Sequence, residues 1–196
     1  MVRWHRRSVP LVAAALVAAA CTGGGDGAPG RAGAGAGAGT TPEASASAPS
    51  SPRATAEGTV GTASVSVDYG RPSRRGRQIF GGLVPFDAVW RTGANAATTL
   101  VLGGTVELGG RPLEAGTYTL YSVPARDGWT LVVNGQTGQW GTEYDAGRDV
   151  VRIPMEVSRP PAPVDTFTIS VESGATDGRL VFAWDTLQGA LPIRTP

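Results

Sequence analysis

The sequence predicts an all-β fold, an antiparallel β-sandwich or jelly-roll of about eight strands, in residues 59–196. Apolar and polar residues alternate in one short stretch after another, and this period of two is typical of strands with one buried face. Turn-forming pairs such as Gly109-Gly110 and Asp177-Gly178 separate the stretches. No stretch shows a convincing helical period, so the pattern favours antiparallel sheets.

The predicted strands follow one another through residues 59–196. The first alternates at Val65, Val67 and Tyr69. In chain order, the later strands alternate at Leu100 and Leu102, Val106 and Leu108, Tyr118 and Leu120, Trp129 to Val133, Val151 to Val157, Phe167 to Val171, and Leu180 to Trp184. A domain of this length can bury a core without disulfides.

One tyrosine within these strands has a predicted structural role. Residues 113–118 read Leu-Glu-Ala-Gly-Thr-Tyr, which resembles the tyrosine corner of Greek-key sandwiches. In that arrangement the tyrosine hydroxyl bonds the backbone a few residues upstream. We therefore expect Tyr118 to stabilise the fold rather than to act in chemistry.

The first twenty residues have the features of a bacterial lipoprotein signal peptide. Arg3, Arg6 and Arg7 form a positive region, and residues 9–20 form an apolar run too short to span a bilayer. The run ends in small residues directly before Cys21, the only cysteine, and this order resembles a lipobox. We expect cleavage before Cys21, lipidation of its sulfur, and an extracytoplasmic protein anchored to the membrane by that lipid.

A low-complexity segment follows the signal peptide. Residues 21–58 are rich in Gly, Ala, Ser and Pro and contain no aromatic and no large apolar residue before the domain. Such a composition buries too little surface to offset the entropy of ordering the chain. The sequence thus predicts three parts: a signal peptide in residues 1–20, a disordered tether in residues 21–58, and a β-sandwich domain in residues 59–196.

The composition excludes several kinds of chemistry. The only histidine, His5, lies in the signal peptide, and the chain has no lysine. A mature chain without these residues has no Ser-His-Asp or Ser-Lys system, no lysine Schiff base, and no histidine-rich or cysteine-rich metal site. We therefore expect neither a cofactor nor a metal. Fourteen arginines against 16 acids leave the mature chain at a net charge of −2, which disfavours nucleic acid as a partner.

The segment before the second predicted strand is unusual. Residues 69–95 carry five arginines among glycines and prolines, namely Arg71, Arg74, Arg75, Arg77 and Arg91. Glycines and prolines shape a long loop into a lid or a ligand site. One interpretation is that Arg77 and Arg91 clamp this loop on buried carbonyls and on acids such as Asp68 or Asp149; the other is that they bind a ligand. We expect Arg74 and Arg75 to lie in solvent at a turn.

Residues in and after this segment resemble a known family. The matches cover residues 68–72, 76–81, 83–85 and 89–95, and continue at residues 115–118, 139–141, 144–145, 149–150, 183–184 and 191–193. Together they are similar to the signature of the bacterial domain of unknown function 2911 (DUF2911), from about residue 63 to the end of the chain. The resemblance implies a secreted or lipid-anchored β-domain and carries no established activity.

A second unusual loop lies at residues 139–149. Trp140 and Tyr144 stand beside the carboxylates of Asp145 and Asp149, a combination found in sugar-binding platforms. The alternative is that Trp140 plugs one end of the sandwich while the two acids pair with arginines. The spacing of the acids does not match an EF-hand loop, so it does not indicate a calcium site.

Two functions remain open on this reading. The first is a binding or structural module for a small polar ligand or glycan, if the two loops meet in a cleft. Its candidate ligand-binding residues are Arg71, Arg77, Trp90, Arg91, Asn95, Trp140, Tyr144, Asp145 and Asp149. The alternative is a glycoside hydrolase with a carboxylate pair about 5 to 9.5 Å apart. Its candidate acids are Asp68, Glu143, Asp145 and Asp149. The sequence makes no prediction of the oligomeric state.

Overall fold

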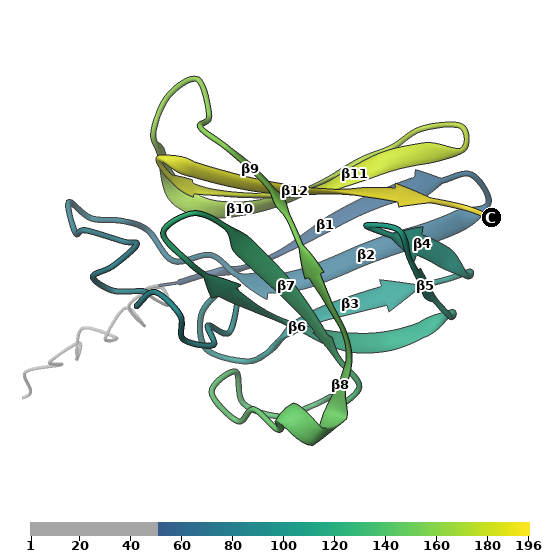
Figure 1. Ribbon diagram of the computed structural model, residues 1–196, viewed down its shortest axis with the longest axis horizontal. Coiled ribbons are helices and arrows are strands. Elements are labelled where there is room, and N and C mark those ends of the chain that lie inside the picture. The colour runs from purple at the N-terminus through teal and green to yellow at the C-terminus, as the bar shows by residue number, and fades with distance from the viewer. Residues whose placement is uncertain (1–50) are drawn as a thin grey trace, which may run out of the picture. The chain divides into compact units, whose positions relative to one another are not determined.

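The computed structural model describes residues 51–196, which form two antiparallel sheets in two layers (Figure 1). The first sheet contains, in spatial order, β1 (Arg53–Val60), β2 (Ala63–Gly70), β3 (Thr98–Leu102), β6 (Gly116–Pro124), β7 (Trp129–Asn134) and β8 (Asp149–Pro154). The second contains β10 (Val164–Glu172), β11 (Asp177–Asp185), β12 (Leu187–Arg194), β4 (Val106–Leu108) and β5 (Arg111–Leu113), and β9 (Glu156–Ser158) pairs with β12. The predicted antiparallel β-sandwich is confirmed.

The described residues form twelve strands where the sequence predicted about eight. Strands β4, β5 and β9 have three residues each, which is too short to show a period of two clearly. The chain passes from β8 in the first sheet to β9 in the second across Met155, so one predicted strand supplies both layers. The only helical element of the described part is one 3₁₀ turn, η1 (Ala146–Arg148).

The start of the domain differs from the prediction. Strand β1 begins at Arg53, so the last residues of the predicted tether, 53–58, belong to the first sheet. β1 pairs with β2 along its whole length, from Arg53 opposite Gly70 to Val60 opposite Ala63. Its inward residues include Ala54 and Ala56, which are too small to give an apolar pattern. Main-chain hydrogen bonds to β2 therefore stabilise a strand that the pattern of side chains does not predict.

Other predictions concern residues that the structure does not describe. The predicted signal peptide, the predicted lipidation of Cys21 and the predicted tether as far as residue 50 lie outside the described range, residues 51–196. Within that range, no helix is long and apolar enough to cross a membrane.

The core lies between the two sheets and follows the alternation in the sequence. In β2, Val65 and Val67 are at most 1% exposed, while Ser64 before them is exposed and Ser66 between them is half-buried. From the second sheet, Phe167, Leu180 and Phe182 are fully buried against them. Burying a side chain of this size contributes about 2 to 3 kcal/mol each, so the core rather than any loop sets the stability of the domain.

Two residues outside this regular pattern also support the sandwich. The Tyr118 hydroxyl donates to the carbonyl of Glu114 over 3.0 Å, which confirms the predicted tyrosine corner. Trp90, from the segment between β2 and β3, inserts its ring between the sheets. It packs against Phe167 and Trp184 at centroid distances of 5.0 and 5.6 Å. Trp90 therefore takes the plugging position that one interpretation of the sequence assigned to Trp140.

Candidate functional site

The segment between β2 and β3, residues 71–97, is anchored on the core. Ile79 and Val84 are at most 1% exposed, and the Val84 amide donates to the Ile79 carbonyl over 2.9 Å. The Phe80 ring meets Trp129 of β7 in an edge contact at 5.3 Å. The amide and carbonyl of Trp90 both bond Ser122 of β6, at 2.7 and 2.9 Å. The segment is therefore held at several points on a rigid scaffold.

A strained turn follows Trp90. Thr92 and Asn95 have positive φ angles, 51° and 65°, which residues with a Cβ rarely adopt. Buried hydrogen bonds hold this conformation: the Thr92 hydroxyl bonds the Ser122 hydroxyl at 2.9 Å, and the Thr98 hydroxyl donates to the Thr92 carbonyl at 2.8 Å. Gly70 permits close packing, because a Cβ there would collide with the carbonyl oxygen of Ala94. Strain held in this way is typical of functional sites.

The segment between β7 and β8, residues 135–148, is organised by Asp149 at its end. This carboxylate accepts hydrogen bonds from Asn134 Nδ2 at 2.9 Å, from the Tyr144 hydroxyl at 2.6 Å and from Arg152 Nε at 2.9 Å. Asp145 accepts from the Gly147 amide at 2.8 Å and thereby caps η1. Both acids thus act within their own loop.

The same network shifts two pKa values in opposite directions. Burial and the hydrogen bond to Asp149 raise the pKa of Tyr144 to about 12. For Asp149, burial acts to raise the pKa, but hydrogen bonds from Tyr144, Asn134 and Arg152 outweigh it and the pKa is lowered. Asp149 is therefore an ionised acceptor and Tyr144 a neutral donor at neutral pH, as a structural network requires.

The two segments meet beside the strained turn. Gly141 donates its amide to the Asn95 carbonyl over 3.1 Å, and Ala96 and Trp140 form an isolated bridge. The close approach depends on glycine, because a Cβ at Gly141 would lie 2.6 Å from the Asn95 carbonyl oxygen and 2.9 Å from Cδ of Arg91. The two loops, whose meeting the sequence left open, are thus in contact.

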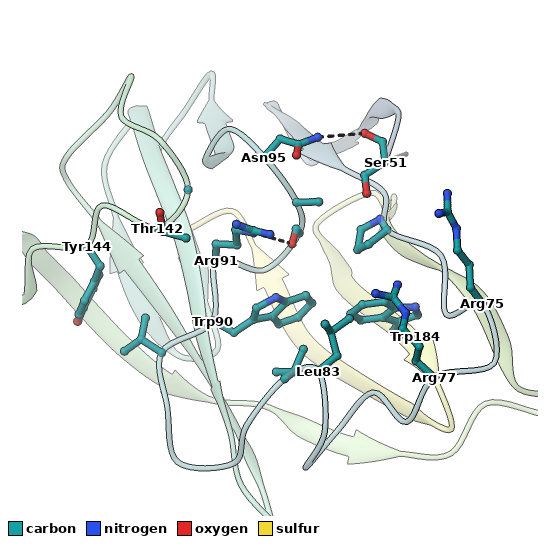
Figure 2. A pocket seen from close by; sticks show the side chains of 16 residues that line it. Ser51, Arg75, Arg77, Leu83, Trp90, Arg91, Asn95, Thr142, Tyr144 and Trp184 are labelled. Carbon is teal, nitrogen blue, oxygen red and sulfur yellow. Dashed lines mark hydrogen bonds between the residues drawn. The ribbon is translucent and has the colours of Figure 1, made fainter. Parts of the chain in front are cut away.

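A cleft of about 440 Å³ lies at this junction (Figure 2). The first segment supplies most of its lining, including Arg75, Arg77, Leu83, Val89, Trp90, Arg91 and Asn95. The second segment adds Gly141, Thr142 and Tyr144, while Ser51 and Trp184 are contributed by the start of the described chain and by β11. The volume lies within the range of small-molecule sites in proteins.

The charged lining of the cleft has one sign. Arg75, Arg77 and Arg91 line it, and none of its described lining residues is acidic. Arg91 donates through Nε to the Gly93 carbonyl at 3.3 Å, and Figure 2 shows its guanidinium directed over Trp90. Arg77 donates to the carbonyls of Arg74 and Ser73 at 3.0 and 2.7 Å. These contacts orient two guanidinium groups without neutralising either one.

The structure brings together five of the nine candidate binding residues. Arg77, Trp90, Arg91, Asn95 and Tyr144 line the cleft. Figure 2 shows that the ring of Tyr144 forms a wall and its hydroxyl points away, in agreement with its bond to Asp149.

Four candidates lie outside the lining. Arg71 donates to the Phe167 carbonyl and the Thr168 hydroxyl of β10 at 3.3 and 3.0 Å. Trp140 is 50% exposed and neither plugs the sandwich nor lines the cleft. Asp145 and Asp149 serve their own loop, so the acids are not part of the cleft.

The expected arginine clamps differ in their partners. Arg77 and Arg91 do bond carbonyls, but not the acids proposed for them: Asp68 is paired with Arg53, and Asp149 with Arg152. Arg74 is not a solvated side chain, because it bonds Asp185 over 2.7 Å. Arg53 lies 15 residues from its partner Asp68, and Arg74 lies 111 residues from Asp185. Proximity in the sequence could therefore not indicate these two pairs.

Several lining residues were not predicted. Arg75 was expected only at a turn in solvent, and the candidate binding residues did not include Leu83, Val89, Thr142 and Trp184. The glycines around residues 76–82, which mark a tightly folded loop, are the one signal in the sequence that could have included Leu83. Ser51 lies in the predicted tether, and no pattern indicated it.

The acids also bear on the hydrolase alternative. None of Asp68, Glu143, Asp145 and Asp149 lines the cleft. In residues 51–196, no group of three or more His, Cys, Asp or Glu residues is arranged to hold a metal ion. The arrangement therefore offers cationic and aromatic contacts rather than acid–base pairs.

These features define a two-sheet antiparallel β domain with a cationic cleft, partly lined by tryptophan, where two long loops meet. The model of the family described as a protein of unknown function (DUF2911) matches residues 51–193. The chain belongs to this family. No curated protein and no solved structure gives a significant match to the chain.

Proposed function

We propose that residues 51–196 form a binding module whose cleft holds a small anionic ligand. The observation that carries the proposal is the lining itself: three guanidinium groups and no carboxylate among the described residues. Guanidinium groups pair with carboxylates and phosphates through two parallel hydrogen bonds. A lining of one sign in a concave site also concentrates anions before they bind.

Arg91 is the residue on which the proposal chiefly depends. Arg91 is half-buried and lines the cleft, and its hydrogen bond to the Gly93 carbonyl uses Nε rather than the two terminal nitrogens of the guanidinium. Gly141 lies close to the stem of the side chain, and the Gly93 carbonyl orients the guanidinium through Nε. A cation held in place before binding loses little entropy when the ligand arrives.

The charge of the cleft narrows the earlier choice between ligands. Carboxylates are strong acceptors for the hydroxyl groups of neutral glycans, and the described lining has none, so a charged ligand fits the three arginines better. An anionic sugar remains within the proposal, because its acidic group can bind Arg91. We do not propose the carboxylate-pair hydrolase, since its candidate acids lie outside the cleft.

The domain is proposed to work outside the cytoplasm, held at the membrane by a lipid on Cys21. The support is the positive region, the short apolar run and the small residues before the single cysteine. Detergent-phase partitioning of the wild type should be lost in Cys21→Ser. A wild-type protein recovered from the medium and cleaved at another site would contradict the anchor.

Anion binding can be tested with a matched pair of sugars. The Cys21→Ser mature chain should bind glucuronate at least about tenfold more tightly than glucose in titration calorimetry, because only glucuronate has a carboxylate for Arg91. Arg91→Gln should remove that difference. The control is Arg148→Gln, whose side chain is 69% exposed and lies outside the cleft.

Citrate and inorganic phosphate extend the test beyond sugars. Binding of any of the three anions that Arg91→Gln weakens and Arg148→Gln leaves unchanged supports the proposal. Absence of Arg91-dependent binding for all three at millimolar concentration, with both variants folded by circular dichroism, would overturn it.

A further inference from the structure

The cleft has apolar residues in solvent as well as cations. Six large hydrophobic side chains of the described part are exposed: Leu83, Val89, Val101, Trp140, Val150 and Val157. Leu83 and Val89 line the cleft at 47% and 40% exposure, and Trp140 is adjacent to Gly141 in its wall. Single exposed hydrophobic residues are ordinary, but two of these six line a cleft that also carries three arginines, and this combination requires an explanation.

The backbone holds Leu83 in this exposed position. The Leu83 amide donates to the Gln78 carbonyl over 3.1 Å, and the next residue, Val84, is 1% exposed and bonded to Ile79. Gly81, with φ of 78°, closes the turn. Val84 is thus directed into the core, while its neighbour Leu83 is 47% exposed at the cleft.

Leu83 and Arg91 lie on different sides of Trp90 in the cleft, and Arg77 lies on the side of Leu83. Figure 2 shows Leu83 on one side of the Trp90 indole and Arg91 with Asn95 on the other. Trp90 is itself partly exposed at this point and contributes an apolar surface between the two sides. A single ligand of moderate size can therefore meet the guanidinium of Arg91 and the side chain of Leu83 together.

We infer that the cleft takes an amphipathic anion, in which an oxyanion group binds Arg91 and an attached apolar group packs against Leu83, Val89 and Trp90. This inference rests on the proposed function and specifies its ligand class. The oxyanion is a carboxylate or a phosphate, since both match the guanidinium fork. The apolar group explains why the cleft keeps exposed hydrophobic side chains beside charged ones, since binding removes their surface from water.

The test uses three probes on the Cys21→Ser mature chain. 4-Phenylbutyrate carries both groups, acetate has only the carboxylate, and 4-phenylbutanol has only the apolar part. 4-Phenylbutyrate should bind about tenfold or more tightly than either partial probe, because it alone makes both contacts. Phenyl phosphate against inorganic phosphate repeats the comparison and shows which oxyanion the cleft prefers.

Two variants separate the contacts. Leu83→Ser should weaken 4-phenylbutyrate and 4-phenylbutanol by a similar factor, about threefold to tenfold, and leave acetate unchanged. Arg91→Gln should weaken 4-phenylbutyrate and acetate and leave 4-phenylbutanol unchanged. The control is Val157→Ser, because Val157 is 41% exposed but lies on β9 outside the cleft.

The failures of the two proposals are distinguishable. If acetate, citrate or glucuronate binds through Arg91 but the phenyl group adds nothing, the amphipathic ligand is wrong and the anion-binding module stands. If no anion binds, both are wrong. If Leu83→Ser changes only the elution volume in size-exclusion chromatography and no affinity, the apolar surface at Leu83 is a contact between copies of the chain, which also overturns the inference.

Discussion

The segment between β2 and β3 and the segment between β7 and β8 meet at one cleft. They differ in whether their charged side chains are paired with an opposite charge. The first, residues 71–97, contains five arginines and one acid, Asp87. Two of its arginines, Arg77 and Arg91, bond carbonyl oxygens and line the cleft. In the second, Asp149 binds Arg152, Tyr144 and Asn134, and Asp145 caps η1.

This difference indicates how the cleft obtains its charge. A guanidinium bonded to carbonyls is oriented but remains a full cation, whereas a carboxylate paired with Arg152 and bonded by Tyr144 presents little net charge. A backbone hydrogen bond of 3.1 Å from Gly141 to Asn95 then joins the two segments. The first segment thus supplies the chemistry of the cleft and the second supplies a neutral, rigid wall.

Displacing the turn that carries Arg91 should have the largest effect. In Gly70→Ala the new methyl group meets the Ala94 carbonyl oxygen, a backbone atom that cannot move alone. We expect a loss of about 3 kcal/mol in the free energy of unfolding, measured by urea denaturation, together with loss of Arg91-dependent anion binding.

Gly128→Ala is the matched control for that substitution. No atom lies within 4 Å of the position of its added Cβ, so its stability should change by less than about 0.5 kcal/mol. Equal losses of stability in the two variants would mean that the close contact of Gly70 with Ala94 does not hold the turn in place.

The two segments can also be compared by removing the carboxylate from one ion pair of each, Asp149 with Arg152 and Asp185 with Arg74. The Asp149 side chain is 13% exposed and accepts three hydrogen bonds, so Asp149→Asn should cost about 2 kcal/mol by leaving its donors unpaired. Asp185 accepts one hydrogen bond, from Arg74 of the first segment, and has φ of 53°, which asparagine tolerates. Asp185→Asn should therefore cost less than about 1 kcal/mol. The reverse order in urea denaturation would contradict the structural role of Asp149.

The smallest effect concerns Tyr144 and appears at alkaline pH. Its pKa is raised from 10.0 to about 12, so the folded chain favours the protonated phenol. This stabilisation is complete below pH 10 and is lost as the pH rises from 10 to about 12. Tyr144→Phe should be less stable than wild type by about 1 kcal/mol near pH 8, and the gap should narrow across that window.

Thermal unfolding at several pH values from 8 to about 12 measures this narrowing. Tyr118→Phe is the comparison, because the Tyr118 hydroxyl bonds only a backbone carbonyl in the described chain. A gap for Tyr144→Phe that stays constant up to pH 12 would show that its hydroxyl is not held by Asp149 in the way the structure describes.

The sequence by itself determined the fold class and one local arrangement. Val65 and Val67 alternate with polar residues because only one face of a strand contacts the core. This period of two is expected in a strand of any β-sandwich. The tyrosine corner could be predicted because Tyr118 and its partner Glu114 lie four residues apart in the sequence. Membership of the family rests on the same linear pattern.

Only the tertiary structure decided which charges face the cleft. Arg77 and Arg91 line it while Arg71 and Arg74 bind β10 and Asp185, although all four come from one segment of similar composition. The partners of the last two lie about one hundred residues away in the chain, at 96 and 111 residues. The sequence shows which side chains carry a charge. The atoms that orient or neutralise each charge depend on packing between strands that lie far apart in the sequence.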